Sequence, residues 1–316
     1  MTVSIEHLQT LLQKLEDDKI KNLEAQADAR RVLQEIGEST DNYPSYDKQL
    51  SEKNTYIAYI LISIACDTVE NNFENQIKVS DIFERASKIL SDNHQYANDH
   101  ENVINLNLLI SSMSFYCAKQ FSKAYITIGK VKTNYPVSSM INYFLKKDFD
   151  HLFSISVDLF YDAPPQSNEQ EVIDRWIVSH EVARCFMIYL DTLYSGHLDR
   201  FNQIESILII LEELCQINRF VDLWLVIRLL KIIFRTFENT SIWQIIPPLM
   251  PQDSLVGRYI RLLSELKPPI TELWPSQLSA VDLATGDNSG GVVNLRTSGG
   301  KTRVAEIAIL KNIDWF

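Results

Sequence analysis

Apolar residues recur at intervals of three and four along most of the chain, the spacing of one face of an α-helix. In the first predicted helix they are Leu8, Leu11, Leu12, Leu15, Ile20, Leu23, Leu33 and Ile36, set among Glu, Lys, Asp and Gln. The pattern predicts helices over residues 1–36, 51–69, 79–90, 101–119, 121–132, 136–147, 169–194, 199–217, 220–237 and 253–266. Gly37 ends the first helix, and residues 162–167 read as a linker-like break. The fold class expected is mainly α, a helical array or bundle.

One pair of these helices has a more specific pattern. Residues 106–131 mix small and large apolar side chains on either side of a tight turn at Lys119 and Gln120. Two antiparallel helices of this kind resemble a tetratricopeptide-type hairpin, and no second copy follows at the 34-residue period of that repeat. A generic helical hairpin is the alternative, and the missing repeat favours it.

The chemistry of the chain changes after Pro268 and Pro269, which cannot lie inside a continuing helix. Five of the nine glycines lie in the last thirty-one residues. There an apolar run at 292–295 predicts a short strand, and a second at 304–310 predicts a helix. We therefore expect a helical accessory domain over 1–267, with a possible break at 162–167, and an α/β domain over 268–316.

The turn between that strand and helix reads Leu295-Arg-Thr-Ser-Gly-Gly-Lys-Thr302. A glycine turn that opens a helix binds phosphate, since backbone N–H groups converge on the anion and the helix adds its positive end. Lys301 would reach the β- and γ-phosphates of ATP, and the Thr302 hydroxyl would hold Mg²⁺. These two residues are the predicted catalytic pair. The first glycine of the usual GxxxxGK[ST] pattern is absent, because Leu295 stands there.

A second element precedes the loop. Trp274, Pro275 and Gln277 lie at the head of a short predicted helix, with the proline near its first turn. With Thr297, Gly300, Lys301, Thr302, Ala305 and Glu306, these residues resemble the opening of a superfamily-two DEAD/DEAH-box helicase. The resemblance covers about an eighth of the chain, and Arg296 and the order Ser298-Gly299 depart from it.

The resemblance implies a RecA-like ATP-binding domain. The residues that would bind ATP and Mg²⁺ are Gln277 at the adenine edge, then Thr297, Ser298, Gly299, Gly300, Lys301 and Thr302 around the phosphates, with Thr302 on the metal. A helicase also needs an acidic box and a second RecA-like domain. Neither is present, so we expect the 316 residues to be the inactive N-terminal portion of a longer enzyme.

The composition points to partners other than nucleic acid for the helical region. The formal net charge is −11, the opposite of a nucleic-acid-binding surface. An acidic helical domain suits a partner protein or a regulatory role, while DNA or RNA would be bound by the motor of the full-length protein. Helical extensions on such enzymes occur in bacterial anti-phage defence, a context that is compatible with this chain.

The remaining features predict a cytoplasmic protein. The N-terminus lacks the basic and apolar regions of a signal peptide, and no apolar run is long enough to cross a membrane. Four widely spaced cysteines predict buried free thiols. His180 lacks a second histidine at metal-ligand spacing and reads as a structural helix residue.

Arg228, Lys231 and Arg235 form a basic stripe on one predicted helix. The stripe is compatible with contacts to a phosphate backbone, and the spacing favours the solvated face of an amphipathic helix.

Two functions follow from these patterns. The first is an ATP-dependent DNA or RNA helicase or translocase with a helical interaction domain. The second is a non-enzymatic helical protein-interaction module in which the nucleotide-binding motif is vestigial.

Overall fold

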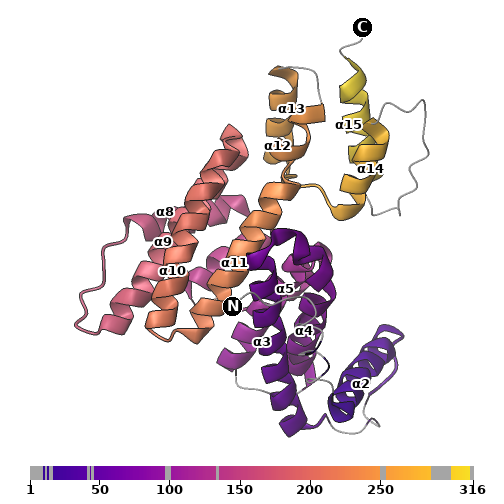
Figure 1. Ribbon diagram of the computed structural model, residues 1–316, viewed down its shortest axis with the longest axis vertical. Coiled ribbons are helices and arrows are strands. Elements are labelled where there is room, and N and C mark those ends of the chain that lie inside the picture. The colour runs from indigo at the N-terminus through magenta and orange to yellow at the C-terminus, as the bar shows by residue number, and fades with distance from the viewer. Residues whose placement is uncertain are drawn as a thin grey trace. The chain divides into compact units, whose positions relative to one another are not determined.

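The structure, a computed structural model, describes residues 17–40, 46–96, 101–132, 135–249, 254–285 and 300–313, with positions 10, 13 and 43. Helices account for most of these residues, which confirms the mainly α prediction (Figure 1). The described residues form no strand, and their extended pairing is an antiparallel bridge between Ser241 and Glu272. The strand predicted at 292–295 lies outside the described residues. The RecA-like part of the fold prediction is therefore not supported.

The chain divides into two compact units. The first comprises Met1–Lys146 and Cys215–Ile232, and the second comprises Lys147–Leu214 and Ile233–Phe316. Each unit is thus built from two segments of sequence. The domain boundary expected between 267 and 268 stays a prediction.

The first unit is a helical array. Its described helices are α2 (Asp18–Glu35), α3 (Lys48–Asn71), α4 (Gln76–Tyr96), α5 (Glu101–Cys117), α6 (Phe121–Ile128), α7 (Pro136–Leu145) and the first half of α11 (Val221–Thr240), with a 3₁₀ turn η1 (Phe73–Asn75). α3 packs on α4, α4 on α5 and α5 on α6, so neighbours in sequence are neighbours in space.

The predicted tight turn between α5 and α6 is confirmed. Lys119 adopts a left-handed φ of 59°, and its N–H donates to the Tyr116 carbonyl at 2.8 Å. Across the hairpin the buried Ser112 hydroxyl donates to the Ala124 carbonyl at 2.7 Å. Small side chains at this crossing let the two helices approach closely, which explains the alternation of small and large residues in the sequence.

The second unit contains α8 (Phe149–Tyr161), α9 (Gln170–Ser195), α10 (Phe201–Ile217), the second half of α11, α12 (Ile242–Ile245), α13 (Ser254–Glu265), α14 (Pro275–Thr285) and α15 (Lys301–Ile313), with 3₁₀ turns η2 (Leu198–Arg200) and η3 (Pro247–Leu249). The sequence pattern did not predict α8. Residues 162–167 lie between α8 and α9. The domain break expected there stays a prediction.

A hydrophobic cluster joins the four C-terminal helices of this unit, and it positions the candidate site. Its buried members are Ile242, Ile246, Ile260, Leu263, Leu273, Ala280, Val281, Val304 and Ile307. They come from α12, α13, α14, α15 and the segment that precedes α14. The helix that follows the glycine turn is therefore held by the same core as the helix that carries Gln277.

The interpretation of Arg228 as part of a solvated basic face is wrong. Its side chain is 2% exposed and donates to Glu70 at 2.7 and 3.2 Å, to Ser63 at 3.3 Å and to Asp67. Burial acts to lower the pKa of Arg228, but the hydrogen bond to Glu70 and the electrostatic effects of Cys66, Glu70 and Asp67 together outweigh it, so the pKa is raised. Arg228 is a buried structural cation of the first unit.

Candidate functional site

Gln277 occupies the third position of α14 and caps the start of that helix. Its Oε1 accepts the backbone N–H of Trp274, the residue before the helix, at 2.8 Å. Pro275 is the first helical residue, where a missing N–H costs no intrahelical bond. The side chain of a glutamine three residues into a helix commonly returns to the N-cap N–H in this way. Gln277 is 9% exposed, so the cap fixes its amide group.

Gly300 forms the turn that opens α15. Its φ is +73°, and its carbonyl accepts the N–H of Arg303 at 3.0 Å. A Cβ built on Gly300 would lie 1.9 Å from Gln277 Nε2. The position therefore requires glycine both for its backbone conformation and for the approach of the Gln277 amide. The structure thus brings the Gln277 amide against Gly300. The two helices that carry these residues, α14 and α15, pack side by side (Figure 1).

Lys301 and Thr302 are the first two residues of α15, and both are exposed. The first N–H groups of a helix have no partner within it, and they carry its partial positive charge. The lysine and the threonine therefore stand at an end of a helix that favours anions. Thr297, Ser298 and Gly299 lie outside the described residues, so their predicted phosphate contacts stay predictions.

Three side chains tie the first turn of α15 to α13, and the sequence pattern gave no sign of them. The Tyr259 hydroxyl donates to Glu306 Oε2 at 2.6 Å, and Arg303 donates to the same hydroxyl at 3.0 Å and to Glu306. Burial and the hydrogen bond to Glu306 raise the pKa of Tyr259 to about 12. Arg303, next to Thr302, is therefore engaged with α13. It holds the turn in place, and Lys301 remains the cation exposed at the helix start.

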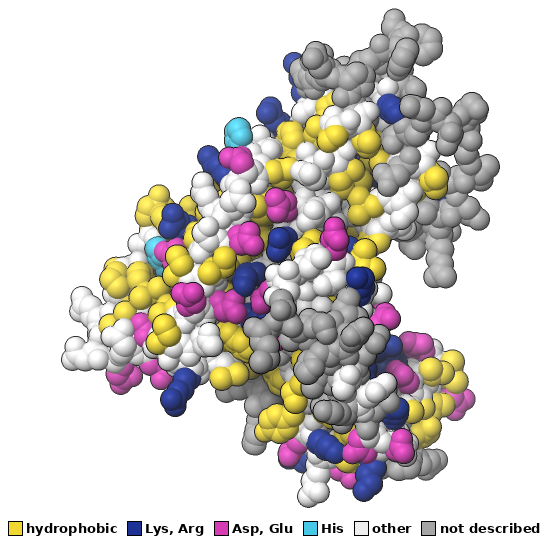
Figure 2. All heavy atoms as spheres, in the orientation of Figure 1, with side chains coloured by type: hydrophobic (Ala, Val, Ile, Leu, Met, Phe, Trp, Pro, Cys, Tyr) yellow, Lys and Arg dark blue, Asp and Glu magenta, His cyan; other side chains and the backbone are white. Residues whose placement is uncertain are grey.

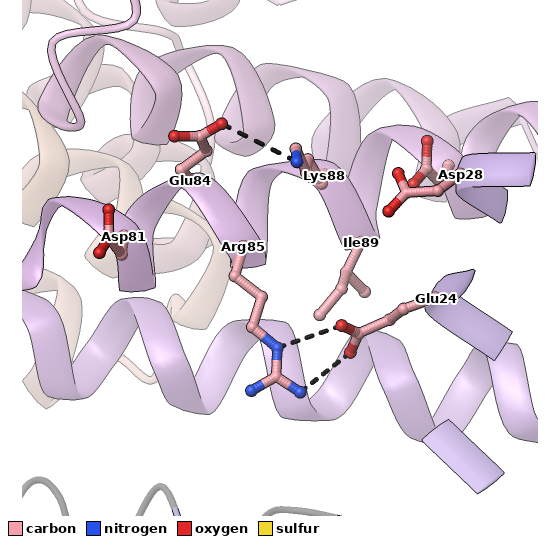
Figure 3. Close-up of a pocket in the computed structure, with 8 residues that line it drawn as sticks. Glu24, Asp28, Asp81, Glu84, Arg85, Lys88 and Ile89 are labelled. Carbon is pink, nitrogen blue, oxygen red and sulfur yellow. Dashed lines mark hydrogen bonds and ion pairs between the residues drawn. The ribbon is translucent and has the colours of Figure 1, made fainter. Parts of the chain in front are cut away.

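A separate pocket of about 320 Å³ lies in the first unit, between α2 and α4 (Figure 3). It is lined by Glu24, Asp28, Asp81, Glu84, Arg85, Lys88, Ile89 and Asp92. Arg85 forms a two-point ion pair with Glu24, and Lys88 lies 3.9 Å from Glu84. Both pairs neutralise part of the acidic lining, and the Arg85–Glu24 pair joins α4 to α2.

Asp92 makes the stability of this region depend on pH. Burial raises its pKa to about 6, against the lowering effect of Arg31, whose Nη2 donates to Asp92 Oδ2 at 3.1 Å. A carboxyl group with a raised folded pKa stabilises the fold below its unfolded pKa near 4 and loses that contribution as pH rises through 6. Its own contribution to the fall in unfolding free energy between pH 4 and pH 7 is about 3 kcal/mol.

Between pH 4 and pH 7 we expect the free energy of unfolding of Asp92→Asn to fall less than that of the wild type, by up to about 3 kcal/mol. Urea unfolding at pH 4, 5, 6 and 7 measures it. Asp81→Asn, in the same pocket but exposed, controls for the loss of one carboxyl group. A wild-type slope in Asp92→Asn would show that another group carries the pH dependence.

Other features have structural roles. The four cysteines are buried thiols and form no disulfide, as predicted. His180 stacks on Phe160 at 5.2 Å between ring centroids, and its Nε2 lies 3.2 Å from the Phe160 carbonyl oxygen, in agreement with a structural role. Within the described ranges, no cluster of His, Cys, Asp and Glu is arranged to hold a metal ion. A search of the same ranges finds no helix that is both long and apolar enough to span a membrane.

Comparison with known proteins gives one line of similarity. The chain matches no family model. It is 27% identical over 312 residues to Hachiman protein HamB of Bacillus cereus, an alignment that covers 98% of this chain and 28% of HamB. The similarity therefore extends over the helical region as well as the C-terminal helices, and the chain spans little more than a quarter of the length of that relative.

These findings correct the expected family. The assignment to the DEAD/DEAH-box helicases is wrong: no family model matches, the relative found over nearly the whole chain is a Hachiman protein, and the described residues form no strand of a RecA-like domain. The adjacency of Gln277 to the Gly300 turn remains an observation of the structure.

Proposed function

We propose that this chain acts in anti-phage defence as part of a longer protein, and that its C-terminal helices bind the phosphates of ATP with Mg²⁺. The similarity to Hachiman protein HamB, an anti-phage defence protein, supports the first part. The observation that carries the second part is the contact of the buried Gln277 amide with the Gly300 turn, directly before Lys301 and Thr302.

Each residue has a role in the proposed site. Lys301 neutralises the β- and γ-phosphates, and the Thr302 hydroxyl is a ligand of Mg²⁺. Gly300 and the predicted partners Thr297, Ser298 and Gly299 contribute the remaining phosphate contacts of the proposed site. Gln277 uses Oε1 to cap α14, and an amide group of this kind has two N–H donors and a second acceptor lone pair with which to read an adenine edge.

The helical region is proposed to bind a protein partner. The chain is acidic, with a net charge of −11, and on the face in Figure 2 the Lys and Arg side chains lie among Asp and Glu. Mixed charge with an acidic excess is a poor surface for a phosphate backbone. Arg228 of the basic stripe is moreover buried in an ion-pair network of its own unit. A helicase or translocase activity on DNA or RNA stays a prediction that concerns the rest of the protein.

Substitution of Lys301 tests the nucleotide site. In the protein made from its native gene, we expect Lys301→Ala to lower ATP turnover at least about 100-fold. Without the lysine ammonium, the negative charge on the β- and γ-phosphates is less stabilised in the transition state. The fold should be unaffected, because a cation at a helix N-terminus is unfavourable to the helix dipole. Turnover is measured by phosphate release with and without DNA or RNA, and stability by thermal unfolding.

Lys311→Ala is the matched control. Lys311 lies in the last turn of the same helix, about 15 Å along its axis. The same charge is removed, and turnover should stay at the wild-type level. Wild-type turnover in Lys301→Ala would rule out the proposed ATP site.

A non-enzymatic interaction module is the second candidate, since helices make up most of the described chain and the HamB alignment runs through them. The intact mass of the native gene product separates the two. A product well above the mass of these 316 residues leaves room for the rest of an ATP-hydrolysing domain. A product of that mass alone, without ATP binding, would favour the interaction module.

A further inference from the structure

Glu272 is a buried acid three residues before α14. Its side chain is 4% exposed, and its Oε1 lies 2.5 Å from the Nζ of Lys147, which is 19% exposed. Its Oε2 lies 3.3 Å from the Thr240 hydroxyl, whose single proton also has the Thr236 carbonyl within reach at 3.0 Å. The Lys147 ammonium also lies over the Phe237 ring, 5.7 Å from the ring centroid. The short bond from the ammonium to the carboxylate is the main interaction of this buried acid, and hydrogen-bonded geometry of this kind is what a buried ion pair requires.

The backbone around Glu272 is fixed at the end of α11. The N–H of Leu273 donates to the Thr240 carbonyl at 2.8 Å, and the N–H of Ile242 donates to the Thr271 carbonyl at 3.1 Å. Leu273 is fully buried in the C-terminal hydrophobic cluster. The segment from Thr271 to Leu273 is therefore held by two backbone bonds, one apolar side chain and one ion pair.

This segment leads without a break into the candidate site. Trp274 precedes α14 and donates its N–H to the side chain of Gln277, whose amide also lies against Gly300. A shift of the Glu272 segment would therefore move the Gln277 amide relative to the turn that precedes Lys301.

We propose that Lys147 and Glu272 are positioning residues for the ATP site, and that their ion pair sets the place of Gln277 against the phosphate turn. This inference rests on the proposed function of that turn. Without the ion pair, the binding-competent arrangement of α14 and the turn is less populated, which weakens apparent ATP affinity by the same factor. Bound ATP restores the arrangement, so the effect falls on KM and not on kcat.

Lys147→Gly removes the ammonium with little cost to the local backbone. Lys147 has a φ of 59°, a conformation that glycine adopts readily, so the backbone gain offsets part of the lost ion pair. We expect KM for ATP to rise about 10-fold, with kcat within about twofold of the wild type. Measurements at 25 °C are made on the full protein, with its melting temperature recorded for each variant.

Arg219→Gly is the matched control. Arg219 also has a φ of 59° and is exposed, in the other unit, so its KM should match that of the wild type. Lys147→Arg restores a cation that reaches Glu272, and it should return KM to within about twofold of the wild type. Glu272→Gln, which keeps the shape of the side chain, should raise KM as Lys147→Gly does.

The outcomes separate this inference from the proposed function. If Lys301→Ala abolishes turnover while Lys147→Gly and Glu272→Gln lower only the melting temperature and leave KM unchanged, the ion pair is structural and the inference fails. If Lys301→Ala itself turns over ATP normally, the proposed site fails and the inference with it. A raised KM that Lys147→Arg reverses supports both.

Discussion

Replacement of Arg228 by alanine is expected to lower the free energy of unfolding of the first unit by about 3 kcal/mol. The substitution removes the hydrogen bonds to Glu70, Asp67 and Ser63, and it leaves a cavity where a nearly unexposed side chain stood. It also removes the guanidinium that lies 4.9 Å from the Trp224 ring centroid. This loss of unfolding free energy is at the low end of the range for breaking a buried ion pair, because solvent reaches Asp67 and Glu70 and stabilises the carboxylates that remain.

Urea unfolding followed by circular dichroism measures this loss. Arg235→Ala is the control: its side chain is 45% exposed and lies 3.9 Å from Glu205, so the expected loss is under about 0.5 kcal/mol. Equal losses in the two variants would mean that the network around Arg228 contributes no more than a surface pair. Glu70→Ala should approach the cost of Arg228→Ala, because it removes the two-point partner of a buried guanidinium.

Gly196→Ala is expected to destabilise the second unit by about 3 kcal/mol, through two additive causes. Gly196 ends α9 with a φ of +76°, and an alanine there meets backbone strain of about 1–2 kcal/mol. Its Cβ would also lie 2.9 Å from Trp243 Cε3, inside contact distance. Trp243 cannot move freely, since its indole N–H donates to the Leu193 carbonyl at 2.8 Å. Overpacking of this kind typically costs 1–3 kcal/mol.

Gly37→Ala measures the cost of backbone strain without the cost of overpacking. Gly37 ends α2 with a φ of +79°, and a Cβ there would meet no atom within 4 Å. We expect a loss of about 1 kcal/mol, measured by urea unfolding. In a Trp243→Leu background the cost of Gly196→Ala should fall to the same level. If Gly196→Ala costs no more than Gly37→Ala with Trp243 intact, the contact with the indole is not a constraint.

Helix positions could be predicted from the sequence because amphipathic spacing is a local signal. The limits of the helices depend on capping residues: Asp17 accepts the N–H of Lys19 and starts α2, and Asp47 accepts the N–H of Leu50 and starts α3. α8 was missed because Phe149–Tyr161 is rich in aromatic and β-branched residues, which lower helix propensity. Packing against α9 overrides that preference.

The candidate site was only partly predictable. The resemblance implied that Gln277 and the turn before Lys301 belong to one site. The structure places the Gln277 amide against Gly300, and ATP binding there stays a prediction. The supporting contacts join residues far apart in the sequence, such as Tyr259 to Glu306 and Lys147 to Glu272, and no local spacing reveals them. The burial of Arg228 could not be predicted for the same reason, because its carboxylate partners lie about 160 positions earlier in the sequence.

The two-segment construction of the first unit sets an order for its assembly during synthesis. The ribosome releases Met1–Lys146 first, and the segment Cys215–Ile232 that completes this unit follows only after α8, α9 and most of α10 have been made. Until Arg228 emerges, the carboxylates of α3 lack the cation that satisfies them in the finished fold. At 5–20 residues per second this interval lasts some seconds. An expression fragment that stops at the apparent end of the first helical segment would hold the unit permanently in that unfinished form.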